Sequence, residues 1–236
     1  IFVIFITLVF GYFILLHSDL YHLARSSGSA ILFLSNIFFF YFLNDYYNPE
    51  AIFNPLLHTW SLAVEIQFYI LFPFLFVFIK KFIKQTYLPL LIIGLMSLLI
   101  SEVGSYVEPR INFFGLQSRI WEFFLGYFIF FFKDKTNISL NNFIKYLLYF
   151  AMVLCAMLFD ENSRHPSLIT FVFLIIPSIL ILNKNQKNYF YFDRGLIFFG
   201  LFSYSLYIWH YPILSLSKSI LFDQGIIIKI SLLMLS

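Results

Sequence analysis

The sequence predicts an all-α protein, a polytopic transmembrane helical bundle with about eight spans. Of its 236 residues, 61% are apolar and 11% are charged, and the mean hydropathy is +0.87. A soluble domain is about 45–50% apolar and about 25% charged, so a soluble globule of this composition would lack a polar coat. No segments alternate between apolar and polar residues as a membrane barrel requires, and open sheets leave backbone groups unsatisfied in lipid. The composition excludes an ordinary soluble enzyme.

Apolar windows between polar segments define the expected spans, because each crossing needs roughly 20 mostly apolar residues. In chain order they lie at 1–16, 61–79, 87–101, 119–132, 143–159, 167–182 and 196–215, with the start of another at 226–236. No repeat or low-complexity linker divides them, so one domain over residues 1–236 is expected. The chain begins without Met and opens and stops within apolar runs, which predicts that this domain is truncated at both ends.

Segment 30–43 is a shorter apolar run, and its Ser35 and Asn36 need polar partners in lipid. At about 1.5 Å per residue it reaches about two-thirds of a hydrocarbon core of roughly 30 Å. A re-entrant hairpin, which we favour, would put Ile1 on the cytoplasmic side. A full pass would put Ile1 outside.

The basic residues predict the orientation, because Lys and Arg concentrate in cytoplasmic loops. Three alternate loops contain most of these basic residues and are expected on the cytoplasmic side. Their basic residues are Lys80, Lys81, Lys84, Lys133, Lys135, Lys184, Lys187 and Arg194. The loops 44–60, 102–118 and 160–166 contain two arginines among more numerous carboxylates. These three loops are expected outside.

Several classes of partner are not expected. The net charge of +3 comes from 15 Lys and Arg against 12 Asp and Glu, and the basic residues are scattered, so nucleic acid is not an expected partner. Cys155 is the single cysteine and cannot form an internal disulfide. No metal-ligand spacing or nucleotide-binding glycine motif occurs, so no bound metal or cofactor is expected.

The first cluster of polar residues lies on segment 54–69. An ionisable side chain in lipid costs at least a few kcal/mol unless it is paired or hydrated, so it marks a candidate functional site. Four side chains recur here at helical spacing and share one face: His58, Ser61, Glu65 and Tyr69. His58 is expected at the outer end, with Glu65 about 10 Å deeper. The alternatives are that His58 is interfacial and that Glu65 packs between helices.

The second cluster consists of Arg119 and Glu122, which lie three residues apart at the start of a span and can form an ion pair. An ordinary interfacial salt bridge is the alternative to a functional pair. Trp121 is expected to anchor the helix at the membrane interface, and Gly126 to allow close helix approach.

The third cluster lies on segment 203–212, where Ser203, Tyr207 and His210 share one helical face. Pro212 would loosen the backbone hydrogen bonds just beyond His210. A structural histidine bonded to a neighbouring helix is the alternative. The predicted orientation puts all three clusters toward the outer side, with a polar cavity opening outward. His17 and His22, which flank the first loop, are instead expected to be solvated, and His165 is expected to be a residue of the loop 160–166 without a functional role.

Three strings carry a family resemblance: Asn54-Pro-Leu-Leu-His-Thr-Trp-Ser-Leu-Ala-Val-Glu-Ile-Gln-Phe-Tyr69, Arg119-Ile-Trp-Glu-Phe-Phe-Leu-Gly126 and Ser203-Tyr-Ser-Leu-Tyr-Ile-Trp-His-Tyr-Pro212. They resemble the hallmark segments of the acyltransferase 3 family of membrane O-acyltransferases, in its O-antigen acetylase-like branch. Phe33-Leu-Ser-Asn36 is similar to a further recurring feature of that family.

The resemblance implies transfer of an acyl group, usually acetyl from acetyl-CoA, to hydroxyls of a cell-surface carbohydrate. The acceptors it implies are the O-antigen of lipopolysaccharide, exopolysaccharide or peptidoglycan. The implied protein crosses the bacterial inner membrane about ten times. Some family members also carry a periplasmic esterase-like domain.

Two departures from the family pattern concern the site. Ile66 stands where the family usually has a second Glu. The family's first helix, with its catalytic His, and its cytoplasmic Arg-x-x-Arg motif would precede Ile1, so the chain is expected to lack part of the catalytic centre.

The resemblance also implies roles for the residues present. The base would be the upstream His, with His58 or His210 orienting the acceptor or relaying protons, and Glu65 fixing a histidine tautomer or binding sugar hydroxyls. Arg119, held by Glu122, would lie near the acceptor entrance. Other expected substrate contacts are Trp60, Tyr69, Ser203 and Tyr207. Two alternatives stay open: a transporter or flippase for a lipid-linked glycan, and a membrane scaffold without catalysis.

Overall fold

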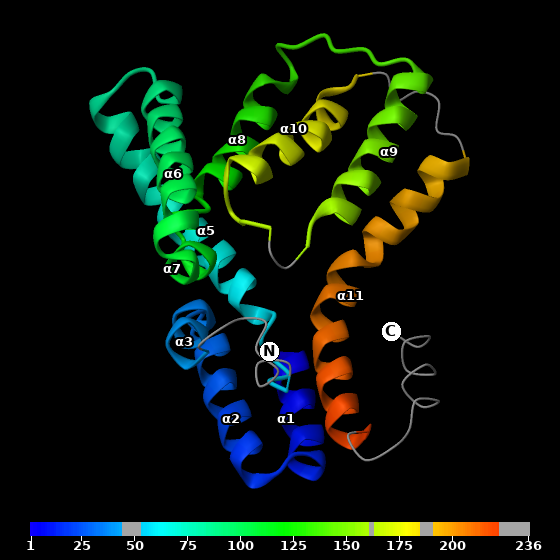
Figure 1. The fold of residues 1–236 in the computed structure, drawn as a ribbon. Coiled ribbons are helices and arrows are strands. Elements are labelled where there is room, and N and C mark those ends of the chain that lie inside the picture. The colour runs from blue at the N-terminus through cyan, green and yellow to red at the C-terminus, as the bar shows by residue number, and fades with distance from the viewer. Residues whose placement is uncertain (44–52, 161–162, 185–190, 222–236) are drawn as a thin grey trace. The chain divides into compact units, whose positions relative to one another are not determined.

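The computed structural model describes residues 1–43, 53–160, 163–184 and 191–221 (Figure 1). Within these ranges every regular element is an α-helix, which confirms the all-α prediction. The helices are α1 Phe2–Ile14, α2 His17–Ile31, α3 Ser35–Phe42, α5 Thr59–Phe82, α6 Tyr87–Val107, α7 Pro109–Phe114, α8 Ile120–Lys133, α9 Asn142–Leu158, α10 Leu168–Leu182 and α11 Tyr191–Leu221.

Three helices of the described chain are long and apolar enough to cross a membrane. They are α5, α6 and the Arg194–Ile220 part of α11. The expected count of about eight spans is therefore not confirmed. At 13, 15 and 17 residues, the apolar helices α1, α10 and α9 are about 20–26 Å long, less than a hydrocarbon core of roughly 30 Å. The expected span at 226–236 lies outside the described residues.

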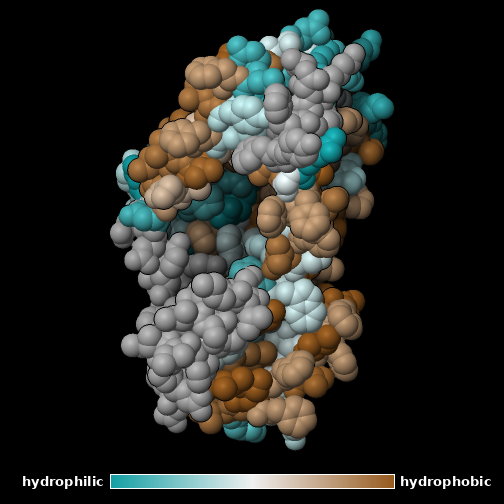
Figure 2. Space-filling view, turned by 90° about the vertical axis from the view of Figure 1, so that its right-hand side faces the viewer, coloured by the Kyte–Doolittle hydropathy of each residue, from teal (hydrophilic) through white to brown (hydrophobic). Residues whose placement is uncertain are grey.

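The exposed surface is rich in large hydrophobic side chains. Phe74 and Phe130, for example, are 73% and 79% exposed. Figure 2 shows hydrophobic side chains over much of the face that it presents. Such a surface is unfavourable in water and suits the hydrocarbon of a bilayer, which agrees with the composition.

The chain divides into two compact units, of which the first contains residues 1–67 and 191–236. In it α1 packs against both α2 and α11, and Figure 1 shows α1 and α2 as antiparallel neighbours. Gly11 of α1 lies against the side chain of Leu23, which is fully buried, so the two helices approach closely there. The expected single domain over residues 1–236 stays a prediction.

The segments 17–29 and 30–43 differ from the prediction. Residues 17–31 form the helix α2 rather than a loop with solvated histidines, and its buried face includes Leu23, Ser26 and Ala30. The run 30–43 is divided between the end of α2, a turn and the eight-residue α3. Because α3 is only about 12 Å long, it cannot cross a bilayer alone.

The turn between α2 and α3 is held by Gln67 of α5. Phe33 adopts a φ of 57°, a left-handed conformation that is uncommon for a bulky side chain. Gln67 donates from Nε2 to the Phe33 carbonyl at 2.8 Å and to Asn36 Oδ1 at 2.8 Å. Ser35 donates to the Thr59 carbonyl at 2.9 Å. Ser35 and Asn36, which were expected to need polar partners, therefore find them in α5.

The second unit, residues 68–190, has its own hydrophobic core. Phe68, Ile79, Leu90 and Phe124 are its buried centre. The helices α6 and α8 pack together, with Gly94 facing the Phe124 side chain at 3.3 Å from an ideal Cβ position. This glycine, not Gly126, allows close approach: nothing lies within 4 Å of a Cβ at Gly126.

Trp121 also differs from its expected role. Its side chain is 4% exposed and meets Phe171 of α10 edge to face, with ring centroids 5.8 Å apart. The indole thus packs inside the second unit rather than anchoring a helix at the membrane interface.

We predict that Gly104→Ala destabilises the protein by about 1–3 kcal/mol, the usual cost of overpacking. A Cβ at Gly104 would lie 2.8 Å from the side-chain oxygen of Asn112, whose amide donates to the Pro166 carbonyl at 2.8 Å. Thermal unfolding of the purified protein in detergent measures the change. The control is Gly126→Ala, which should be neutral or stabilising by about 0.5–1 kcal/mol because it adds helix propensity in open space. Equal stabilities of the two variants would contradict the packing described for Gly104.

Candidate active site

His58 lies at the end of a tight turn that leads into α5. Asn54 Oδ1 accepts hydrogen bonds from the Leu56 N–H and the Ser26 hydroxyl, both at 3.3 Å. Successive backbone bonds follow, including one from the Thr59 N–H to the Leu56 carbonyl at 3.0 Å. Asn is favoured in such turns because its side chain can replace a backbone acceptor. The turn places the His58 side chain inside the first unit, where it is 4% exposed.

Tyr207 of α11 connects this turn to the C-terminal helix. Its hydroxyl donates to the His58 carbonyl at 2.9 Å, and it also shares a short hydrogen bond with the Ser61 hydroxyl. The two segments are 149 residues apart in sequence. Both segments belong to the first unit, and the structure brings residues of the first and third polar clusters into contact.

Aromatic rings from α11 surround the His58 imidazole. The centroids of Tyr207 and His210 lie 5.6 and 5.8 Å from it, both in edge-to-face arrangements. Tyr211, which the sequence analysis did not single out, stacks on His58 at 5.7 Å with an interplanar angle of 25°. The His58 ring is therefore held on several sides by α11.

The hydrogen bond of His210 defines its tautomer. Nδ1 lies 2.6 Å from the Tyr207 carbonyl oxygen. A carbonyl oxygen can only accept, so Nδ1 carries the proton and donates it. In the neutral ring Nε2 then has the lone pair and can accept a proton or a hydrogen bond.

The environment of His58 keeps its imidazole neutral. His58 precedes the membrane-spanning helix, and burial, reinforced by the nearby His210, lowers its pKa to about 4. The backbone carbonyls of Ile208 and Pro55 oppose part of this lowering. At pH 7 the ring is uncharged, so it can exchange hydrogen bonds with a substrate without bringing a buried charge.

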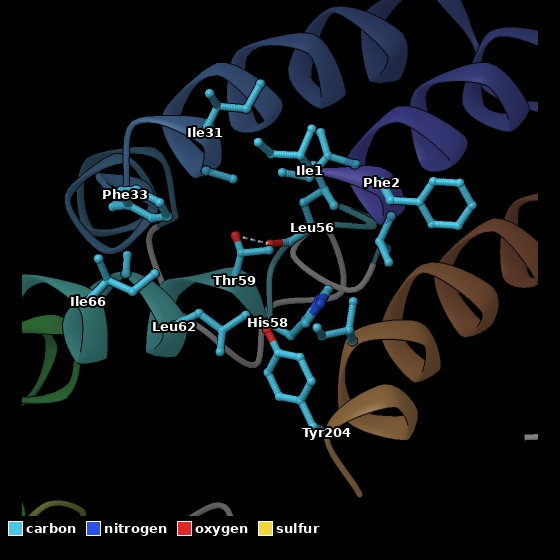
Figure 3. A pocket seen from close by; sticks show the side chains of 15 residues that line it. Ile1, Phe2, Ile31, Phe33, Leu56, His58, Thr59, Leu62, Ile66 and Tyr204 are labelled. Carbon is cyan, nitrogen blue, oxygen red and sulfur yellow. Dashed lines mark hydrogen bonds between the residues drawn. The ribbon is translucent and has the colours of Figure 1, made fainter. Parts of the chain in front are cut away.

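A cavity of about 310 Å³ lies beside His58 within the first unit. Figure 3 shows His58, Thr59 and Tyr204 around it together with aliphatic side chains such as Leu62 and Ile66. The Thr59 hydroxyl is occupied by the Leu56 carbonyl at 2.7 Å. The lining is thus mostly apolar, with the His58 imidazole as a polar group in its wall.

The other expected site residues of the first unit have varied surroundings. Trp60 is buried, at 7% exposure, and Glu65 is half-buried two turns into α5. Ser203 is exposed, and its hydroxyl donates to the Gly200 carbonyl of its own helix at 2.8 Å. Ser203 is therefore turned toward its helix rather than toward the imidazoles.

Arg119 and Glu122 form the expected ion pair in the second unit. Arg119 Nη1 lies 3.5 Å from Glu122 Oε2, and Arg119 Nε donates to the Phe113 carbonyl at 3.1 Å. Arg119 is 9% exposed. Tyr69, another expected site residue of the second unit, is 58% exposed. The proximity of this pair to the histidines of the first unit stays a prediction.

His165 belongs to the surroundings of Arg119 rather than to a solvated loop. Burial, followed by the charge of Arg119, lowers its pKa to about 4. Its Nδ1 shares a hydrogen bond with the Thr170 hydroxyl at 2.9 Å. His165 lies in the loop as expected, and this loop folds back so that its ring meets that of Phe113 with centroids 6.4 Å apart.

No metal centre is evident in the part of the chain that the structure describes, since no three His, Cys, Asp or Glu side chains there gather closely enough. The candidate site described so far consists of the adjoining His58 and His210 rings and the cavity that His58 lines.

The sequence profile of the acyltransferase 3 family, described as an acyltransferase domain, matches residues 1–236. The chain belongs to this family. It is 32% identical over 209 residues to O-acetyltransferase OatA of Staphylococcus aureus strain NCTC 8325 / PS 47, covering 80% of this chain. OatA of strain COL matches with the same identity and coverage. The chain spans about a third of the length of these curated relatives, namely 34%. No solved structure matches it.

We predict that lowering the pH from 7.5 to 5 destabilises this acyltransferase 3 protein through His58 and His165. Their folded pKa of about 4 lies below the ordinary value of about 6.5, so the unfolded chain binds more protons between these values. The stability is complete above about pH 6.5 and falls as the pH drops toward 4. The loss at pH 5 is about 2 kcal/mol per histidine.

Thermal unfolding in detergent at the two pH values measures this loss. His165→Asn should reduce the pH dependence, and His17→Asn, which replaces an exposed histidine of α2, should leave it unchanged. An identical pH dependence in His165→Asn and the wild type would contradict the neutral state of buried His165.

Proposed function

We propose that the chain is the catalytic membrane domain of an O-acyltransferase. It transfers an acetyl group from acetyl-CoA to a hydroxyl of a cell-surface polysaccharide. The observation that carries this proposal is the His58 imidazole, which lines a cavity and adjoins the His210 ring, within a chain of the acyltransferase 3 family. The names of the matched OatA relatives support acetyl as the acyl group.

The reaction needs a proton acceptor for the attacking hydroxyl. The oxygen of the attacking hydroxyl forms a bond to the thioester carbonyl carbon, and the C–S bond breaks. The hydroxyl proton finally passes to the CoA sulfur. His210 Nε2 has its lone pair available because Nδ1 is committed to the Tyr207 carbonyl. His210 therefore orients the acceptor hydroxyl and relays its proton, in the role of a general base or of a partner to one.

His58 acts beside it as a neutral hydrogen-bonding group. A ring with a pKa of about 4 is a weak base at pH 7, so it suits orientation better than proton abstraction. Glu65 lies seven residues along the same helix, about 10 Å deeper, where its carboxylate can bind sugar hydroxyls. The acceptor is the glycan of lipopolysaccharide, exopolysaccharide or peptidoglycan at the outer face of the inner membrane.

The second unit supplies a carbohydrate contact. The Arg119 guanidinium is held by Glu122 and by the Phe113 carbonyl, so its orientation is fixed before substrate binds. Tyr69 and Tyr207 supply aromatic surface for sugar faces. Tyr69 is well exposed for this purpose, whereas Trp60 is buried and acts through packing.

We predict that His210→Ala lowers polysaccharide O-acetylation by about 10²–10⁴-fold, the usual contribution of acid–base catalysis. His58→Ala should lower it by about 10²-fold, the effect of a misplaced substrate. Cells expressing the whole protein with each change are compared by the alkali-labile acetate on their isolated polysaccharides. The matched control is His17→Ala in α2, an exposed histidine outside the cavity lining, which should acetylate at the wild-type level.

Wild-type acetylation in both histidine variants, at equal protein levels in the membrane, would exclude these roles. Translocation of a lipid-linked glycan without acetyl transfer would instead favour the transporter alternative. The absence of both acetyl transfer and translocation would favour a scaffold.

A further inference from the structure

The cavity beside His58 is larger than the acetyl group of the proposed reaction requires. Its volume is about 310 Å³. An apolar protein cavity of about 150 Å³ is sufficient to enclose a molecule of benzene. By the same measure the cavity beside His58 has room for roughly ten carbon atoms, far more than an acetyl group contains.

The polar and apolar parts of the cavity lining lie on different sides. Figure 3 shows His58 and Tyr204 on one side of the cavity. The opposite wall is apolar and includes Ile31, Phe33 and Ile66. A ligand in this cavity therefore meets polar side chains at the His58 end and only hydrocarbon at the other end.

The apolar wall is held in place by hydrogen bonds of the turn between α2 and α3. Gln67 donates from Nε2 to the Phe33 carbonyl and to Asn36 Oδ1, each at 2.8 Å. These bonds fix the turn from which Phe33 contributes to the lining. A wall that is formed before the ligand arrives loses little conformational entropy on binding, which favours affinity.

Among the groups that meet at His58 in the proposed reaction, the acyl group is the one that suits an apolar wall. The acceptor sugar carries hydroxyls, which are costly to bury without hydrogen-bond partners. A hydrocarbon chain instead gains about fourfold in affinity for each methylene that it buries. With its carbonyl carbon at the His58 end, where the acceptor hydroxyl attacks, an acyl chain extends toward the apolar wall.

We propose that the cavity is an acyl-chain pocket, through which the site transfers acyl groups of about four to eight carbons as well as acetyl. This inference rests on the proposed acyl transfer and names its donors as short- and medium-chain acyl thioesters of CoA. The bonds that change are the same for each donor. An ester bond forms between the acceptor oxygen and the acyl carbonyl carbon, the thioester C–S bond breaks, and the hydroxyl proton passes to the CoA sulfur.

A series of donors tests the length of the pocket. The purified whole protein receives acetyl-, butyryl-, hexanoyl-, octanoyl- or hexadecanoyl-CoA, with polysaccharide freed of its esters by alkali as the acceptor. Mass spectrometry measures the ester formed. The KM for the donor should fall by up to about fourfold for each added methylene until the cavity is filled. The hexadecanoyl chain exceeds the cavity and should be transferred poorly.

Two alanines of α2 provide a matched pair of variants. Ala30 lines the cavity and is 8% exposed, whereas Ala24 is exposed and lies outside the lining. Ala30→Leu should lower the ratio of hexanoyl to acetyl transfer, each as kcat/KM, by about tenfold, the lost burial of roughly two methylenes. Ala24→Leu should keep the wild-type ratio. Both donors are compared on one preparation, so a smaller folded fraction cancels from the ratio.

Ile66→Ala tests the pocket in the opposite direction. It removes hydrocarbon from the apolar wall and should extend the longest acyl group transferred by about two carbons. If Ala30→Leu does not fold, this extension decides the point.

Acetyl transfer without transfer of butyryl or hexanoyl groups would overturn the inference and leave the proposed function intact. An equal hexanoyl-to-acetyl ratio in Ala30→Leu and Ala24→Leu would also overturn it, and would fit a cavity that holds a membrane lipid tail. If no acyl group is transferred, acetyl included, the proposed function itself fails.

Discussion

The hydrogen bond from the Tyr207 hydroxyl to the His58 carbonyl is the contact on which the candidate site depends. It fixes the start of α5 against the middle of α11. The neighbouring contacts follow from this placement: Tyr211 stacks on His58, His210 faces it edge to face, and the Ser61 hydroxyl meets Tyr207. In mostly apolar surroundings an unpaired polar group is costly, so each of these bonds also stabilises the fold. The same atoms thus serve structure and chemistry.

The two histidines differ in their hydrogen bonding. His210 donates through Nδ1 to a carbonyl of its own helix and leaves Nε2 as acceptor. Nδ1 of His58 is buried without a hydrogen-bond partner among the described residues. Because His58 is neutral at pH 7, the two rings lie side by side without the repulsion of two charges.

Helical periodicity was sufficient to predict the centre of the site. The spacing of Ser61 relative to His58, and of Tyr207 relative to His210, put these side chains on common faces, and the structure brings the two faces together. The stacking of Tyr211 on His58 could not be predicted, since it arises from the contact of α11 with a turn far away in sequence. His165 was missed because loop residues show no periodicity that would indicate burial.

Other errors have a different physical origin. In a helix that is apolar on all sides, the pattern does not identify the face that packs, so Trp121 and Gly126 were assigned by residue type alone. The structure buries Trp121 against Phe171 and leaves Gly126 open. Helix α2 has a nearly balanced polar and apolar composition, which resembles a loop in a hydropathy window. Its buried stripe becomes evident only once α1 and α3 lie beside it.

The long sequence separation within the first unit has a consequence for biosynthesis. His58 leaves the ribosome 149 residues before Tyr207, which at about 5–20 residues per second is roughly 7–30 s. During that interval the His58 carbonyl and the Ser61 hydroxyl lack the partner that they have in the folded protein. The site is consequently completed only when α11 arrives. Until then the Ser61 hydroxyl and the His58 carbonyl have only their hydrogen bond to each other, at 3.1 Å, so the start of α5 is held less firmly in the nascent chain than in the finished protein.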